Sequence, residues 1–158
     1  MSQRAAPGSF AAPIAACMLA ALFVLTVRAA EPDPAVLRYT LPADYKWVDS
    51  KEYPGLKSVV LYGDPSKPGP YAVLNRFAAG TFSRPHFHPN DRVIVVVSGT
   101  WWMGTGDKFD TSATKPMPPG SSAVHYGGKV HFDGAKGEDC EVIIFGIGPA
   151  TATRVGER

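Results

Sequence analysis

Four histidines are the residues whose types and spacing best suit metal chemistry in this sequence. They form two clusters, His86 with His88 and His125 with His131. His86 and His88 are two positions apart, and residues i and i+2 of a β-strand point to the same face. Two imidazoles on one inward face of a barrel can hold a divalent metal ion. Two surface histidines on an edge strand would give the same spacing, so the pair alone does not define a site.

Glycines and an arginine stand at fixed distances from the first cluster. Five residues separate Gly80 from His86, and three separate His88 from Arg92. Six more residues lie between Arg92 and Gly99. The first cluster therefore belongs to the pattern G-x5-H-x-H-x3-R-x6-G.

The second cluster belongs to a comparable pattern. Five residues separate Gly120 from Tyr126, and Gly128 follows two positions later. Two residues then precede His131, and Ala135 stands four positions beyond it. The second pattern is therefore G-x5-Y-x-G-x2-H-x3-A.

Together the two patterns resemble the signature motifs of the cupin superfamily. Those motifs are G-x5-H-x-H, three or four residues, E-x6-G, and G-x5-P-x-G-x2-H-x3-N. The resemblance spans about residues 56–148. Within the superfamily, the sequence resembles the small single-domain cupins related to the cupin module of the ChrR anti-sigma factor. It implies an all-β fold, a double-stranded β-helix or jelly-roll-like barrel. It also implies that His86, His88 and His131 bind a metal.

The sequence departs from the cupin motifs at three positions. Arg92 replaces the metal-binding glutamate, and a protonated guanidinium has no lone pair to donate. Tyr126 replaces the proline and Ala135 the asparagine. A three-histidine site with open positions, as in thiol dioxygenases of the superfamily, is one outcome. His125 is an alternative fourth ligand, and Asp91 another that would need a β-bulge. Loss of the metal with retention of the fold is a further alternative.

The ligand types narrow the chemistry of such a site. A neutral three-histidine site suits Fe(II), Zn, Cu or Ni and keeps the full charge of the ion, which favours anionic substrates. If Arg92 points inward, it can clamp a substrate carboxylate. If it points outward, it can pair with an acid such as Asp91. Arg84 shares the strand parity of His86 and is a second candidate clamp. The Tyr126 phenol can donate a proton or a hydrogen bond.

The resemblance implies a metal-dependent cupin that acts on a small, anionic organic molecule. Oxygen-dependent, dioxygenase-like oxidation is the first reaction class that it suggests, although cupins support many chemistries. The alternatives are a non-enzymatic module that senses or sequesters a metal or small ligand, and an isomerase or hydrolase. The resemblance also makes a homodimer plausible.

The elements that must position the histidines are predicted to be short strands. Apolar and β-branched runs are separated by Gly and Pro turns, and no segment shows a helical period over three turns. The predicted strands are residues 56–62, 71–77, 93–97, 101–104, 121–126 and 141–147. The strand 101–104 follows 93–97 at the distance expected for a hairpin.

The N-terminus resembles a secretory signal peptide. Arg4 precedes an apolar stretch at 11–27, and small residues follow before the acidic, proline-containing segment 31–34. We expect residues 1–30 to be a signal peptide that directs the protein to the periplasm or outside the cell, with no stable membrane insertion after cleavage. A retained membrane anchor is the alternative, and Cys17 fits a lipoprotein site poorly. The expected domains are a leader at 31–55, the cupin domain at 56–149 and a tail at 150–158.

Charge and cysteine content argue against a nucleic-acid-binding protein and against a protein stabilised by an internal disulfide. The chain of 158 residues has a formal net charge of +2 and no Lys/Arg-rich run, so it lacks the footprint of a nucleic-acid-binding protein. Without the signal peptide, Cys140 is the one remaining cysteine, so no internal disulfide can form. The acidic residues on both sides of Cys140 disfavour a thiolate, which predicts a passive strand residue.

Overall fold

A computed structural model of the chain describes residues 30–155. The predicted signal peptide, residues 1–30, lies outside this range except for its last residue. The chain divides into two units, Met1–Tyr39 and Thr40–Arg158. The described residues of the first unit are exposed and contain one turn at 34–36. Within the described range, no helix is long and apolar enough to cross a membrane.

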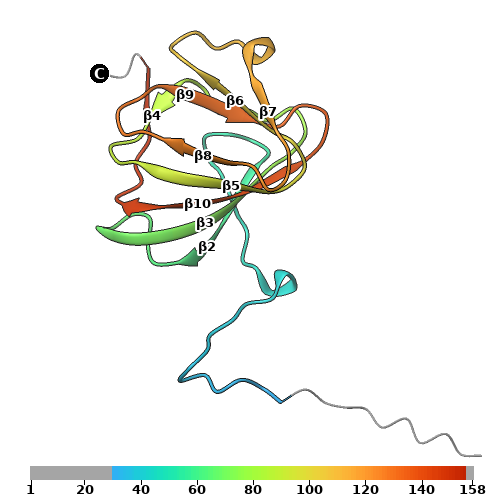
Figure 1. Cartoon of the computed structure of the whole chain (residues 1–158), viewed down its shortest axis with the longest axis vertical. Coiled ribbons are helices and arrows are strands. Elements are labelled where there is room, and N and C mark those ends of the chain that lie inside the picture. Colours follow the sequence, from blue (N-terminus) through green and yellow to red (C-terminus); the bar gives the residue numbers. More distant parts are fainter. Residues whose placement is uncertain (1–29, 156–158) are drawn as a thin grey trace, which may run out of the picture. The chain divides into compact units, whose positions relative to one another are not determined.

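The second unit contains a larger sheet of six antiparallel strands (Figure 1). Their order across the sheet is β1-β2-β3-β10-β5-β8. Strands from the middle and the end of the chain are therefore neighbours. The strands are β1 (Val48–Asp49), β2 (Leu56–Tyr62), β3 (Gly69–Phe77), β5 (Arg92–Ser98), β8 (Ser122–His125) and β10 (Cys140–Gly148).

A smaller sheet of five antiparallel strands carries two of the four histidines. Its order is β11-β4-β9-β6-β7. Its strands are β4 (His86–Phe87), β6 (Trp101–Thr105), β7 (Lys115–Met117), β9 (His131–Gly134) and β11 (Thr153–Arg154). Two short 3-10 turns, Pro42–Asp44 and Thr111–Ala113, complete the described elements. The predicted all-β fold is confirmed.

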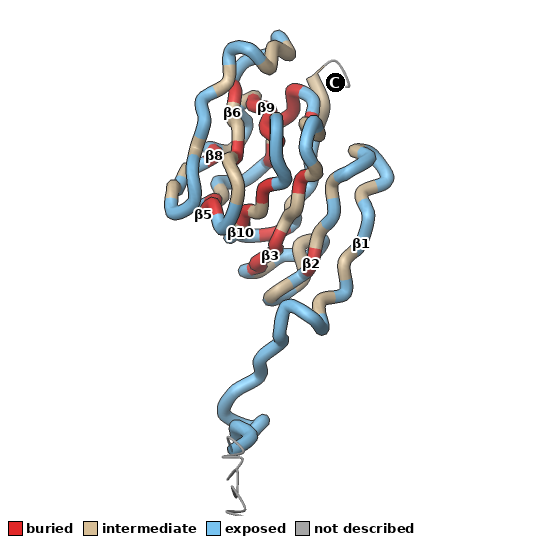
Figure 2. Tube along the Cα trace, turned by 90° about the vertical axis from the view of Figure 1, so that its right-hand side faces the viewer, coloured by how far each residue is buried: buried red, intermediate tan, exposed pale blue. Residues whose placement is uncertain are grey.

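The core follows from the two-residue period of the strands. In β10 buried positions alternate with more exposed ones from Cys140 to Ile144 (Figure 2). In β5 the buried Ile94 and Val96 lie on either side of the more exposed Val95. Because side chains of a strand alternate between faces, these residues form one inward apolar layer together with the buried Trp101. Cys140 belongs to this layer as a free thiol, and burial raises its pKa to about 12. This agrees with the prediction of a passive strand residue.

The outward face of the larger sheet also carries apolar side chains. Val93 lies in register with Val124 on one side and Phe145 on the other, and all three are exposed. Register partners share a face, so they form one apolar row across three strands. The homodimer expected from the sequence stays a prediction, and this row is a surface on which to look for it.

The predicted strand at residues 56–62 coincides with β2. Each of the other five predicted strands matches an observed strand, and their end points differ by at most two residues. The predicted hairpin between 93–97 and 101–104 is wrong, because β5 lies in the larger sheet and β6 in the smaller one. Gly99 makes the turn between them at a φ of +62°. A Cβ at this position would collide with the carbonyl oxygen of Asp139.

Gly99→Ala should destabilise the protein more than Gly120→Ala. Both glycines have positive φ, but a Cβ at Gly120 would meet no atom within 4 Å. We expect Gly120→Ala to lower the free energy of unfolding by about 1–2 kcal/mol. Gly99→Ala should cost about 2 kcal/mol more, because the main chain of β10 must also move. Urea denaturation of both variants measures the difference between their free energies of unfolding. Equal losses of stability would contradict a role for the close approach of Gly99 to the Asp139 carbonyl.

Candidate metal centre

Strand pairing brings three histidines from distant parts of the chain together. His86 in β4 lies in register with His131 in β9, and their ring centroids are 4.5 Å apart. His88, two positions after His86, places its ring 4.8 Å from that of His86. All three are buried, with 3–6% of their surface exposed. The i, i+2 spacing therefore puts both imidazoles on one inward face.

The main chain sets the tautomer of each of these three rings. In each ring Nδ1 lies within hydrogen-bond distance of a main-chain carbonyl oxygen, which can only accept. Nδ1 therefore carries the proton and donates, and Nε2 keeps its lone pair. The bonds are His86 to Arg84 (2.7 Å), His88 to Thr151 (2.8 Å) and His131 to Lys129 (3.0 Å). This outer-shell arrangement is typical of histidines that bind metal through Nε2.

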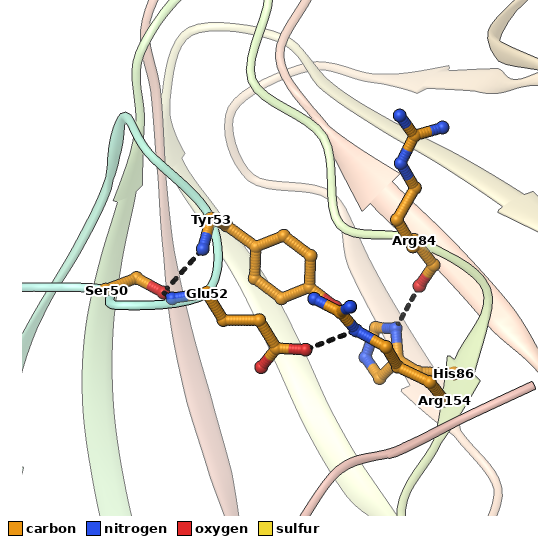
Figure 3. Close-up of polar contacts among 6 residues, drawn as sticks. All are labelled: Ser50, Glu52, Tyr53, Arg84, His86 and Arg154. Carbon is orange, nitrogen blue, oxygen red and sulfur yellow. Dashed lines mark hydrogen bonds and ion pairs between the residues drawn. The ribbon is translucent and has the colours of Figure 1, made fainter. Parts of the chain in front are cut away.

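Figure 3 shows how the edge of the smaller sheet holds His86. The ring faces the carbonyl oxygen of Arg84, and Arg154 of β11 is the register partner of His86. The Arg154 guanidinium pairs with the Glu52 carboxylate at 2.5 Å and lies 5.3 Å from the Tyr53 ring centroid. This pairing fastens β11, the strand beside His86, to the segment before β2.

Arg84, a candidate clamp, contributes its carbonyl rather than its charge to the histidines. Its guanidinium lies over the Phe109 ring, 4.3 Å from the centroid. It also lines a surface pocket of about 360 Å³ together with Tyr53 and Arg154. The positive charge of Arg84 is thus directed toward Phe109 and this surface pocket.

The three histidines fit a divalent metal ion. One ligand atom from each of His86, His88 and His131 lies within 4.8 Å of the other two. His88 Nε2 is buried and has no hydrogen-bond partner. Burial lowers the pKa of His88 to about 2 and also lowers that of His131, so both are neutral and able to donate a lone pair at pH 7. A bound metal would satisfy the otherwise unpartnered nitrogen.

The side chain of Arg92 lies among the histidines. Its Nη2 is 3.2 Å from His125 Nδ1 and 3.4 Å from His131 Nε2. Burial lowers the pKa of Arg92, while the negative charge of Asp133 and a hydrogen bond with Tyr71 raise it. Among the described residues Arg92 forms no ion pair with Asp91, whose carboxylate instead accepts a hydrogen bond from the Gly127 amide at 2.7 Å. Asp91 thereby braces the loop after β8.

His125 has the opposite tautomer to the other three histidines. It ends β8 directly opposite Arg92, and an arginine can only donate. His125 Nδ1 therefore accepts, and the proton is on Nε2, which is buried without a partner. Since both Nε and Nη2 of Arg92 engage its Nδ1 lone pair, whereas only Nη2 approaches His131, His125 is less suited to be a fourth ligand than the sequence alone indicated.

Asp133 is a buried acid that the sequence analysis missed. It follows His131 by two positions in β9 and accepts a hydrogen bond from the Ser83 hydroxyl at 2.9 Å. One ligand atom from each of His125, His131 and Asp133 lies within 4.8 Å of the others. The His-x-Asp spacing on one strand was the signal, because it places both side chains on the same face.

Tyr126 lies next to this centre in sequence, but its side chain is largely outside. The residue is 63% exposed, and its hydroxyl forms no hydrogen bond with any of residues 30–155. Its role as a proton donor stays a prediction.

Solved structures with similar folds support the assignment of the fold. The polyketide cyclase RemF from Streptomyces resistomycificus has a TM-score of 0.64 at 16% identity, over 75% of this chain and 85% of that one. A cupin-2 domain from Rhodospirillum rubrum has a TM-score of 0.60 at 12% identity, over 77% and 81%. A cupin-superfamily sugar phosphate isomerase from Silicibacter pomeroyi has a TM-score of 0.55 at 18% identity, over 67% and 73%.

No protein-family model and no curated protein matches the sequence. The similar structures show that the chain has a cupin-like fold. The chain therefore combines a cupin-like fold with a buried, histidine-rich centre that suits a metal ion. The finer likeness to the ChrR module stays a prediction.

The metal-free protein should lose stability as the pH falls below 6.5. Burial depresses the pKa values of His88, His125 and His131 in the folded state, so the unfolded chain binds more protons below its own histidine pKa. Their contribution is complete above pH 6.5 and is lost as the pH falls toward the folded pKa values. Between pH 6 and 5 we expect a loss of about 1.4 kcal/mol per pH unit for each histidine. Denaturation after treatment with a chelator measures the slope. A His88→Gln/His125→Gln variant should show a shallower one, and an unchanged slope would contradict the assignment.

Proposed function

We propose that this protein is a metal-dependent cupin that binds one divalent transition metal ion and acts on a small organic anion. The supporting observation is that the buried His86, His88 and His131 donate their Nδ1 protons to main-chain carbonyls, which leaves each Nε2 a lone pair, and that one ring nitrogen of each lies within 4.8 Å of the others. Neutral nitrogen ligands suit iron, zinc, copper or nickel. The expected signal peptide would place this activity in the periplasm or outside the cell.

The chain's own residues account for the choice of an anionic ligand. When bound, the metal supplies Lewis acidity toward an oxygen or nitrogen atom of its ligand. The histidines remain neutral and do not cancel the charge of the ion. Arg92 adds a permanent positive charge and hydrogen-bond donors beside them. Burial in the barrel strengthens these interactions by excluding water.

Oxygen-dependent oxidation is the reaction class that we propose to test first. It follows from the resemblance to three-histidine cupins and from the lack of a carboxylate at position 92. Isomerase or hydrolase chemistry is an alternative, because similar folds include a cyclase and a sugar phosphate isomerase.

One observation favours a second candidate function, a module that binds a metal without catalysis. All four histidines are nearly inaccessible to solvent. A closed set of ligands that included His125 would leave no position for a substrate. Such a protein would sense or sequester a metal or a small ligand.

The metal content of variants distinguishes the proposed ligands His86 and His88 from the neighbouring His125. Protein purified from its natural compartment without added metal should contain about one ion per chain. His86→Ala/His88→Ala should lose it, whereas His125→Gln should retain it because Arg92 engages His125 Nδ1. Elemental analysis gives both the content and the element. Iron or copper then calls for an oxygen-uptake assay, and zinc for a hydrolysis assay. Wild-type protein that lacks metal and takes up none on reconstitution would refute the proposal.

An open coordination position distinguishes the enzyme from the binding module. In cobalt-substituted protein, azide should shift the visible absorption bands, because a three-histidine site leaves positions for exogenous ligands. His125→Gln should respond to azide as the wild type does. If the wild type does not respond and His125→Gln does, His125 closes the site and the binding module is the better description.

A further inference from the structure

The barrel interior contains a second group of cation ligands beside the proposed metal centre. It consists of His125, His131 and Asp133, all buried, with one ligand atom from each within 4.8 Å of the others. His131 belongs to both groups. The two groups cannot therefore be treated as independent sites.

In this structure the second group holds the guanidinium of Arg92. Nη2 lies 3.2 Å from His125 Nδ1 and 3.4 Å from His131 Nε2, and Nε lies 3.4 Å from His125 Nδ1. Asp133 is the acid whose charge acts on the guanidinium. The Arg92 guanidinium thus occupies a position of the kind that a metal ion could take, with two imidazole acceptors beside it and the buried Asp133 carboxylate nearby.

The shared histidine has one lone pair available. His131 Nδ1 carries a proton and donates to the Lys129 carbonyl, so only Nε2 can accept. That lone pair can accept a hydrogen bond from Arg92 or bind a metal ion, but it cannot do both. The two cations would also be neighbours in a buried site, where like charges repel strongly.

We propose that His125, His131 and Asp133 form a second cation position, filled by Arg92, which competes with the metal for His131. The inference rests on the proposed function and concerns the regulation of the same centre. A metal ion that binds at His86, His88 and His131 displaces the Arg92 contact with His131, while Arg92 keeps its contacts with His125 and the electrostatic attraction of Asp133. The affinity of the centre for its metal is therefore lower than it would be without Arg92.

Zinc titration of the metal-free full chain tests the competition. Arg92→Met removes the competing cation and should tighten zinc binding by about tenfold or more, a change as large as other outer-shell effects on metal sites. Arg76→Met is the matched control. It removes a guanidinium that pairs with Glu141 and lies over Trp47, so its zinc affinity should stay within about threefold of the wild type. Arg92→Met should bind a single zinc ion, because the two positions share one lone pair.

The outcomes separate this inference from the proposed function. Equal zinc affinities of Arg92→Met and wild type would overturn the competition and leave the metal centre intact. Two zinc ions in Arg92→Met would also overturn it, because the positions would then be independent. If neither protein binds zinc, the proposed function fails and the competition with it.

A measurement on the wild type does not depend on how the variant folds. Nitrogen NMR signals of the histidine rings should show His131 Nε2 and the Arg92 guanidinium changing together as zinc is added. His125 Nδ1 should keep the shift of a hydrogen-bond acceptor. An Arg92 signal that is unchanged at full zinc occupancy would overturn the inference.

Discussion

The site depends on hydrogen bonds between histidine Nδ1 protons and main-chain carbonyls. Arg84, Lys129 and Thr151 supply these carbonyls from segments next to β4, β9 and β11. Because the acceptors belong to the main chain, the fold itself determines the tautomer, and no side-chain partner is needed. The same bonds orient the rings, so three imidazoles are brought close together by the fold itself. The cost of assembling the ligands is therefore met during folding, which favours binding of an ion.

Burying a guanidinium beside this centre requires compensation within the barrel. Arg92 has neutral imidazole acceptors at His125 and His131, and the nearby negative charge comes from Asp133. Asp133 is itself held by the Ser83 hydroxyl, across the bridge that joins Phe82 to Gly134. An isolated buried charge would be costly, whereas a cation with hydrogen bonds and a carboxylate nearby is tolerated. Arg92 and Asp133 therefore belong to one arrangement, and removing either changes the environment of the other.

The sequence predicted the clustering of three histidines better than it predicted their surroundings. The i, i+2 spacing of His86 and His88 and the motif position of His131 placed these three together. β4 and β9 were missed because strands of two and four residues have no measurable period. The predicted β5–β6 hairpin was wrong because these two strands, although consecutive in the sequence, belong to different sheets. The position of Arg92 depends on its register with His125 across β5 and β8, and such non-local pairing is not encoded in local spacing.

The replacement of a motif carboxylate by Arg92 changes the physical character of the centre. A glutamate would add a negative ligand and cancel part of the charge of the ion, whereas an arginine adds charge of the same sign. The arginine would thus lower the affinity of the centre for a metal ion and increase its attraction for an anion. An anion that lay between the ion and the guanidinium would reduce their repulsion and stabilise both. Metal binding and anion binding are then coupled, and by linkage each strengthens the other. Such coupling suits a site that would bind its metal more firmly when its anionic ligand is present.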